Sequence, residues 1–332
     1  MPSFRSKFCR ILTKYLAAAK FNPNKTIDEM RRVAESLTWL ARLPSNTKVE
    51  KIAINYPAAS NGVSSGNYYR PKGRGIKPLS AEGGLNSLSA EWICATDARQ
   101  DRAILYLHGG GYNICSPNTH RELAANISKA SGAKVLLPDY RLAPEHPFPS
   151  ALEDAILAYR WLLDTGFTGA KIAIAGDSAG GGLSIATSVS LRDAGEPSPA
   201  SIACISPWTD LEMSGNSIKT QAEIDPMVNL ELLKIMASNY IGDAAPRSPL
   251  ISPIYADLQA IPPLLIHAGS DEILLDDSKR IAEKAKRSGV DVRLKIYDQM
   301  WHVFHLNARL MPEAKHAINE LGSFIRQHYD IP

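Results

Sequence analysis

A serine set between glycines is the residue of this sequence best placed to do chemistry. The stretch KIAIAGDSAGGGLSIATSV (171–189) opens with apolar residues typical of a buried strand and closes with small residues at helical spacing. Ser178 therefore falls at a strand-to-helix turn, which presents its hydroxyl away from the sheet where Gly176 and Gly180 leave room for the bend. The N-terminus of the following helix favours a developing negative charge. This placement indicates a nucleophile rather than a chance serine in a glycine-rich turn.

A serine nucleophile needs a base, and histidine is the usual one. In the chain order serine, acid, histidine, the base comes from the last part of the sequence. His302 and His305 lie in DQMWHVFH, directly after a predicted strand, where α/β sheets collect their reactive groups. His302 is nearer to the strand end and is the predicted base. His267 lies inside a predicted strand, whereas His316 and His328 of the terminal helix are expected to face solvent.

The acid is expected in the loop after the preceding predicted strand. That loop, in LLIHAGSDEILLDD, offers four carboxylates: Asp271, Glu272, Asp276 and Asp277. Asp271 follows the strand almost immediately. Asp276 and Asp277 fall at the start of a helix, where a carboxylate usually complements the helix dipole. Asp271 is therefore the predicted acid.

A run of three glycines supplies candidate donors for an oxyanion. LYLHGGGYN places residues 109–111 just past a predicted strand, where backbone N–H groups approach a ligand without an intervening Cβ. The run lacks the lysine of a P-loop and the G-x-G-x-x-G spacing, so phosphate binding is disfavoured. The N–H group of Ala179, the residue after the serine, is expected to add a further donor.

These residues must be positioned by an alternation of strands and helices. The predicted strands are 49–54, 91–95, 103–108, 134–140, 171–176, 201–206, 263–269 and 292–298. The predicted helices between and after them are 118–131, 150–165, 179–193, 274–288 and 308–328. Such an alternation predicts an α/β fold with a mostly parallel central sheet of about eight strands, flanked by helices.

Two segments interrupt this alternation and divide the chain. Residues 1–45 are predicted to be helical without a strand, and residues 207–250 are turn-rich with a helix near 229–240. Residues 55–84, rich in Gly, Ser, Asn and Pro, are predicted to form a long surface loop. The predicted organisation is an α/β core in two parts, 46–206 and 251–332, with additions at 1–45 and 207–250.

Charge and cysteine usage disfavour several classes of protein. The 332 residues include 37 basic and 34 acidic side chains, and the net charge of +3 does not favour nucleic acid as a partner. The four cysteines lie far apart without C-x-x-C spacing, which disfavours a zinc site or a disulfide framework and predicts a reducing, cytoplasmic location. No run of about 18 apolar residues is present, so no transmembrane segment is predicted.

The first residues have the pattern of an amphipathic helix. Basic residues interrupt the apolar ones, so the stretch lacks the continuous apolar region of a signal peptide. One side of the predicted helix carries six apolar residues, namely Phe4, Phe8, Ile11, Leu12, Tyr15 and Leu16. We expect this stripe to pack against the protein itself, and contact with a membrane surface is the alternative.

Four motifs together resemble the hormone-sensitive-lipase-like branch of the α/β-hydrolase esterases. They are HGGGY, YRLAPEHPFPSALED (140–154), GDSAGGG and SPWTDL, and the similarity runs from about Glu91 to the C-terminus. The resemblance implies the α/β-hydrolase fold with a helical cap formed by 1–45 and 207–250. The chain is also similar to bacterial esterases and monoterpene ε-lactone hydrolases, which suggests a class of substrate.

The resemblance also implies roles for residues of the glycine motifs. The oxyanion hole would be formed by Gly109, Gly110 and Ala179. The residues that support the two motifs would be His108, Gly111 and Asp177.

The acid and base of the family can be carried over in the same way. Asp271 of DEILLDD stands in the place of the acid in the family's D-P-L-x-D-E-like stretch. Glu272 replaces the usual proline there, and the stretch is one residue longer. His302 of HVF corresponds to the histidine of the family's H-G-F motif.

The sequence thus predicts a serine hydrolase that cleaves carboxylic esters of short to medium acyl chain through an acyl-enzyme. His302 would take the proton of Ser178, and Asp271 would hold the imidazole. No cofactor or metal is implied, and apolar residues of the predicted cap favour a small apolar ester or lactone as substrate. A lactone hydrolase or amidase with the same triad and a non-catalytic ligand-binding protein are the alternatives. The family resemblance also allows a homodimer.

Overall fold

An eight-stranded sheet forms the centre of the molecule. The computed structural model describes residues 2–20, 22–56 and 87–329. The strands are β1 (Thr47–Asn55), β2 (Ser87–Ala95), β3 (Arg99–Leu107), β4 (Ala133–Pro138), β5 (Ile172–Asp177), β6 (Ser201–Ile205), β7 (Leu264–Gly269) and β8 (Val292–Tyr297). Their order in the sheet is β1-β2-β4-β3-β5-β6-β7-β8. Strand β2 pairs antiparallel with β1 and β4, and all other neighbours are parallel, which confirms the predicted sheet.

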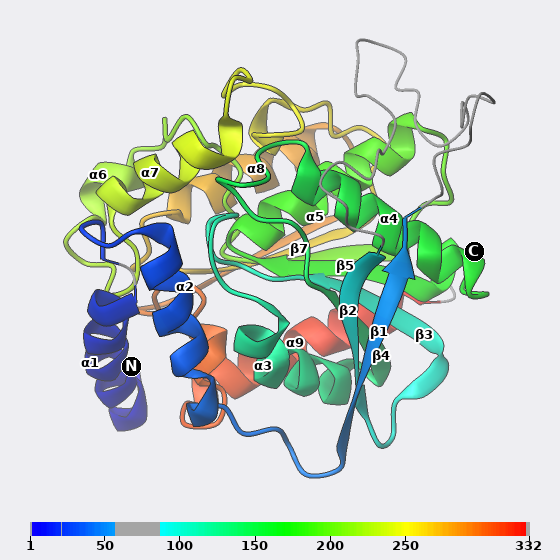
Figure 1. Ribbon diagram of the computed structural model, residues 1–332, viewed down its shortest axis with the longest axis horizontal. Coiled ribbons are helices and arrows are strands. Elements are labelled where there is room, and N and C mark those ends of the chain that lie inside the picture. The colour runs from blue at the N-terminus through cyan, green and yellow to red at the C-terminus, as the bar shows by residue number, and fades with distance from the viewer. Residues whose placement is uncertain (1, 21, 57–86, 330–332) are drawn as a thin grey trace.

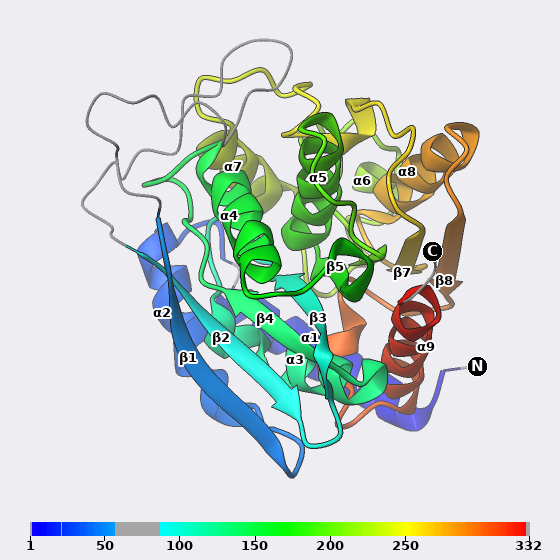
Figure 2. The same ribbon diagram turned by 90° about the vertical axis from the view of Figure 1, so that its right-hand side faces the viewer.

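Helices cover both faces of this sheet, as Figure 2 shows. One face is covered by α3 (Pro117–Ser131) and α9 (Pro312–His328), and the other by α4 (Ser150–Asp164), α5 (Ala179–Asp193) and α8 (Leu275–Arg287). The central strands β5, β6 and β7 are buried along their whole length, as expected for parallel strands covered on both sides. Both faces of the sheet therefore contribute to the core.

Local sequence signals fix the ends of several helices. Ser116 caps α3 by accepting a hydrogen bond from the N–H of Asn118, and Pro117 occupies the first turn. The same helix ends at Gly132, whose φ of 67° is left-handed. At the N-terminal side of α2 (Ile27–Ser36), Thr26 and Glu29 form a reciprocal capping box.

The remaining helices gather on one side of the molecule, at the left of Figure 1. They are α1 (Phe4–Lys20) and α2 from the N-terminal segment, and α6 (Ser217–Thr220) and α7 (Leu230–Ile241) from residues 207–250, which we call the second insertion. Short 3-10 turns are η1 (Thr38–Leu40), η2 (Gly169–Lys171), η3 (Pro253–Tyr255) and η4 (Phe304–Asn307). Among the described residues, no helix is both long enough and apolar enough to cross a bilayer.

Most predicted elements coincide with observed ones. All eight predicted strands are present, and the predicted helices match α3, α4, α5, α7, α8 and α9. The last helix begins at Pro312 rather than at residue 308, because residues 308–310 form a turn and a proline stands at the first helical position. The predicted 55–84 loop falls largely outside the described residues.

The prediction for the apolar stripe of α1 is wrong for most of its members. Phe4, Phe8, Ile11 and Tyr15 are 85, 58, 60 and 75% exposed. The side of α1 that packs on the protein carries small residues instead, namely Ser6, Cys9 and Ala17. The helix therefore turns its most apolar side chains to solvent.

Candidate active site

Ser178 occupies a strained turn between β5 and α5. Its φ of 53° and ψ of −122° are unusual for a residue with a side chain. Its carbonyl accepts the N–H of Trp208 at 2.9 Å, and its own N–H donates to the carbonyl of Ile205 at 2.8 Å. A Cβ on Gly180 would collide with the backbone carbonyl of Leu107. The sequence motif therefore does produce the sharp turn that was expected from it.

Ser178 and His302 line the same cavity, which has a volume of about 50 Å³. Around them the wall is mostly apolar and comes partly from the second insertion, through Met227, Val228, Leu232, Leu233 and Met236. His302 is 3% exposed, and burial lowers its pKa to about 4. Near neutral pH the imidazole is therefore uncharged, which is the form that accepts a proton.

The other histidines near the end of the chain do not face this cavity. His305 lies in η4, and its Nε2 is 3.2 Å from Nδ1 of His267, which is buried in β7 as predicted. His316 is largely exposed, also as predicted. His328 is 6% exposed and its Nδ1 bonds the carbonyl of Phe324, so the prediction that it faces solvent is wrong.

Asp271 binds the N-terminal helix α1. Its carboxylate accepts a hydrogen bond from Arg10 of α1 at 2.7 Å and another from the hydroxyl of Ser270 at 2.8 Å. The side chain is 22% exposed. In the described parts of the chain, no hydrogen bond joins Asp271 to His302. The structure therefore does not bring together the acid and the base that the sequence analysis paired.

The neighbouring carboxylate, Glu272, is turned into the core. Its Oε2 accepts hydrogen bonds from the hydroxyl of Ser206 at 2.7 Å and from the N–H of Gly269 at 3.0 Å. The same hydroxyl accepts the N–H of Val303, which follows His302 directly, at 3.1 Å. Burial raises the pKa of Glu272 to about 8.

One atom of Glu272 and one of His302 are left unsatisfied in this arrangement. Oε1 of Glu272 and Nδ1 of His302 are both buried, and neither has a hydrogen-bond partner among the described residues. A buried polar atom without a partner is costly and rare in proteins. Glu272 is one of the four carboxylates that the sequence offers in this loop, and Asp271 was predicted instead because it lies nearer to the end of the predicted strand.

The glycine run is arranged differently from the expectation. The N–H of Gly109 donates to Oδ1 of Asp177 at 3.1 Å, so it is already engaged. Gly110 and Gly111 line the cavity with φ values of 116° and 61°. Within the described ranges, no hydrogen bond engages the N–H groups of Gly110, Gly111 or Ala179. Gly109 therefore supports the loop, whereas Gly110 and Gly111 line the cavity.

Asp177, which precedes the nucleophile, connects three parts of the site. Besides Gly109 it binds the hydroxyl of Tyr106 at 2.8 Å and Nε2 of His120 at 3.2 Å. Burial alone would raise the pKa of Asp177, but the charge of His120 and hydrogen bonds from His120 and Tyr106 lower it. A Cβ at Gly109 would collide with the Asp177 carboxylate. The glycine is therefore needed for this close approach.

His108, expected to support the motif, is buried beside the glycine run. Its ring stacks on Tyr140 with centroids 4.3 Å apart, and the hydroxyl of Tyr140 donates to the carbonyl of His108 at 2.6 Å. Its Nδ1 lies 2.8 Å from the carbonyl of Gly109. These contacts fix the backbone from which the glycine loop begins.

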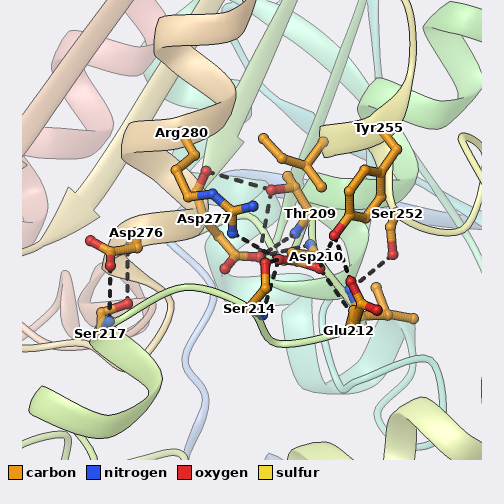
Figure 3. A network of polar contacts seen from close by, with 12 residues as sticks. Thr209, Asp210, Glu212, Ser214, Ser217, Ser252, Tyr255, Asp276, Asp277 and Arg280 are labelled. Atoms are coloured by element: carbon orange, nitrogen blue, oxygen red, sulfur yellow. Dashed lines mark hydrogen bonds and ion pairs between the residues drawn. The ribbon is translucent and has the colours of Figure 1, made fainter. Parts of the chain in front are cut away.

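The start of the second insertion is held by a buried polar network (Figure 3). Oδ2 of Asp277 accepts the N–H groups of Thr209 and Asp210, each at 2.8 Å. Asp210 in turn accepts hydrogen bonds from Arg280 at 2.7 Å and from the hydroxyl of Ser214 at 2.5 Å. Burial raises the pKa of Asp277 to about 7. This carboxylate at the start of α8 thus does more than complement the helix dipole.

The site offers no evident metal ligands. Across residues 2–20, 22–56 and 87–329, no group of three or more His, Cys, Asp or Glu side chains could hold a metal ion. All four cysteines lie in this part of the chain and are free.

Comparison with known proteins agrees with the fold. Residues 104–306 match the model of the alpha/beta hydrolase fold family. An acetyl-hydrolase of Streptomyces hygroscopicus is 40% identical over 299 residues, which cover 90% of this chain and 95% of the relative. An esterase of Acinetobacter venetianus is 37% identical over 228 residues, which cover 68% of this chain and 75% of that relative.

Solved structures agree as well. A crystal structure of an esterase from the bacterial hormone-sensitive lipase family superimposes with a TM-score of 0.86 at 41% identity, and covers 99% of each chain. The protein therefore belongs to the alpha/beta hydrolase family, in its hormone-sensitive-lipase-like branch, and it is an esterase.

Proposed function

We propose that this esterase cleaves carboxylic esters of short to medium acyl chain through an acyl-enzyme formed on Ser178, with His302 as base and Glu272 as the acid. The observation that carries the proposal is the common cavity of Ser178 and His302, with an uncharged imidazole near neutral pH. The alternative acid, Asp271, is engaged by Arg10.

The first half of the reaction forms the acyl-enzyme. His302 accepts the proton of the Ser178 hydroxyl as its oxygen attacks the ester carbonyl, and the imidazole becomes cationic. The carbonyl oxygen becomes an oxyanion and then re-forms the carbonyl as the alcohol leaves. His302 protonates the departing alcohol. In the second half, His302 activates a water molecule that releases the acid and restores the serine.

Glu272 is suited to stabilise the imidazolium. A hydrogen bond from Nδ1–H of His302 to Oε1 of Glu272 would satisfy both unpaired buried atoms at once. Burial favours the protonated form of Glu272, whereas the hydroxyl of Ser206 and the N–H of Gly269 favour the carboxylate, and a hydrogen bond from the cationic imidazole would favour the carboxylate further. The Ser206 hydroxyl also accepts the N–H of Val303, which directly follows His302, and so fixes the position of His302 relative to Glu272.

The oxyanion is proposed to bind the N–H groups of Gly110, Gly111 and Ala179. Among the described residues, no hydrogen bond engages these three N–H groups. Ala179 also begins α5, whose N-terminus adds a favourable dipole. Each such donor contributes about 3 kcal/mol to stabilising the transition state.

The size of the cavity supports a short acyl group. About 50 Å³ lies around Ser178, and the wall toward the second insertion is apolar. A second cavity of about 270 Å³ shares Met227, Val303 and Leu306 with it and offers room for a longer chain. We propose that the segments 1–45 and 207–250 together form a cap over these cavities. The acetyl-hydrolase named above is a similar protein that supports the shorter end of this range.

Adjacent carboxylates provide a matched test of the acid. We expect Glu272→Gln to lower kcat by up to about four orders of magnitude, as loss of the acid does in other serine triads. Asp271→Asn should leave kcat within about threefold of the wild type, since its carboxylate binds Arg10 instead. The measurement is hydrolysis of p-nitrophenyl acetate and longer p-nitrophenyl esters, with Ser178→Ala as the inactive reference. A severe Asp271→Asn with a mild Glu272→Gln would return the role to Asp271.

A further inference from the structure

The exposed face of α1 has the spacing of a single continuous stripe. Phe4, Phe8, Ile11 and Tyr15 are separated by four, three and four residues, which places them one above another on a helix. All four are more than half exposed. Isolated apolar residues on a surface are common, but an aligned row of large ones marks an interaction site.

Cations flank the stripe on the same helix. Arg5, Lys7 and Lys14 are exposed, and none of them forms an ion pair or a side-chain hydrogen bond with a described residue. The 17 residues of α1 include no Asp or Glu. A surface of this kind is complementary to anionic groups, whereas a second α1 placed against it would bring like charges together.

The stripe lies beside the mouth of the larger cavity. Leu12 of α1, Leu40 of η1 and Leu310 line that cavity, and they are 36, 36 and 39% exposed. Trp39, the neighbour of Leu40 in η1, is 76% exposed. The apolar surface of α1 therefore continues into the cavity that borders the catalytic one.

Contacts with the core hold α1 in this orientation. Arg10 donates to Asp271, to the carbonyl of Gln299 at 3.3 Å and to the carbonyl of Ile224 at 2.7 Å. At the start of the helix, the N–H of Ser3 binds Glu313 of α9 at 2.6 Å. The exposed stripe is thus presented outward by a helix that is already attached.

We propose that the face of α1 formed by Phe4, Phe8, Ile11 and Tyr15 docks on lipid surfaces that carry anionic headgroups. The apolar side chains enter the boundary between headgroups and acyl chains, and Arg5, Lys7 and Lys14 lie at the headgroups. In this orientation the mouth of the larger cavity opens toward the lipid. Esters that partition into such a surface then reach the cavity without crossing bulk water.

Flotation with lipid vesicles tests the proposal. The full chain is mixed with vesicles of phosphatidylcholine, or of phosphatidylcholine and phosphatidylglycerol in equal parts, and floated on a density gradient. We expect the wild type to float with the anionic vesicles. The double variant Phe8→Glu/Ile11→Glu should lower the bound fraction by about tenfold or more, because two large apolar side chains no longer enter the lipid.

Control variants separate the electrostatic contribution to lipid binding from the apolar one. Lys7→Gln/Lys14→Gln should weaken binding to the anionic vesicles, most clearly at low salt. Ile235→Glu, an exposed isoleucine of α7, should bind like the wild type. None of these side chains lines the catalytic cavity, so hydrolysis of p-nitrophenyl acetate without lipid should be unchanged and shows that each variant is folded.

Three outcomes would overturn the proposal. The wild type could stay at the bottom of the gradient with anionic vesicles, or the Glu double variant could float as well as the wild type. Light scattering could instead show a dimer that the Glu variant abolishes, without vesicle binding, which would assign the face to a second copy. Flotation is measured without turnover, so it stands or fails independently of the proposed triad.

Discussion

The two segments that we propose to form the cap are attached to the core in opposite ways. The 207–217 segment is held by buried polar atoms, with Asp277 accepting two backbone N–H groups (Figure 3). The polar contacts that hold the N-terminal helix α1 are partly exposed: Ser3 binds Glu313, and Arg10 forms an ion pair with Asp271 whose two side chains are 29 and 22% exposed. The loss of a buried hydrogen bond costs far more free energy of unfolding than the loss of a partly exposed ion pair. The 207–217 segment is therefore firmly fixed to the core, whereas α1 can be detached at a much smaller cost in free energy.

The largest loss of stability is expected when the anchor of the 207–217 segment is removed. Asp277→Ala leaves the N–H groups of Thr209 and Asp210 without partners in the interior and should lower the free energy of unfolding by about 2 to 4 kcal/mol. Asp276→Ala is the matched control, because that half-buried carboxylate accepts a single N–H from Ser217. Urea denaturation measures both. Equal losses in the two variants would contradict the special role of Asp277.

The pH dependence of this network should be visible in the isosteric variant Asp277→Asn. The pKa of Asp277 is raised from 3.8 to about 7 by burial, so the folded state keeps a proton that the unfolded state loses. Its contribution to stability is complete below about pH 4 and is lost as the pH rises through about 7.

The measurement is urea denaturation of both proteins at about pH 5 and about pH 8. Between these two values the wild type should lose more stability than Asp277→Asn, since the variant has no proton to release at this position. A wild type and a variant that change in parallel would show that Asp277 does not titrate across this range.

A smaller effect is expected where the two cavities meet. Met227 lines both the catalytic cavity and the larger one beneath α1. Met227→Ala removes part of the side chain that separates the two cavities. The kcat/KM for longer p-nitrophenyl esters should therefore rise by about tenfold relative to that for the acetate. Met236→Ala is the control, because Met236 lines only the catalytic cavity. An unchanged preference in Met227→Ala would mean that the larger cavity does not receive the acyl chain.

The smallest loss of stability is expected for a substitution in α1. Arg10→Ala should lower the free energy of unfolding by about 1 kcal/mol or less, because its ion pair is partly exposed. Amide hydrogen exchange should nevertheless increase in α1 and remain unchanged in α8. A loss as large as that of Asp277→Ala would abolish the contrast between the two segments.

The sequence was sufficient for the sheet and for the turn that carries Ser178. Period, strand length and turn residues are local signals, so the eight strands and the bend at Ser178 follow from short stretches. The choice between Asp271 and Glu272 is not local. Two adjacent side chains after a strand point in different directions, and only the packing of α1 and of Ser206 decides which one is buried.

The outward face of α1 was missed for a similar reason. An amphipathic pattern shows that a helix has an apolar side, but the side that meets the core depends on the partner surface. Here small residues such as Ser6, Cys9 and Ala17 allow a close approach of the helix to its neighbours. The contact between Gly109 and Asp177 was equally invisible, because it joins residues 68 positions apart.

That last contact couples two parts of the reaction centre mechanically. Asp177 belongs to the same turn as Ser178, and it holds Gly109 at the base of the loop that carries Gly110 and Gly111. Displacement of the turn therefore carries the loop with it. Motion of α1 and α7 then changes the width of the entrance, while the spacing between the Ser178 hydroxyl and the N–H groups of Gly110 and Gly111 stays constant. On warming, access to the serine should change before its intrinsic reactivity does.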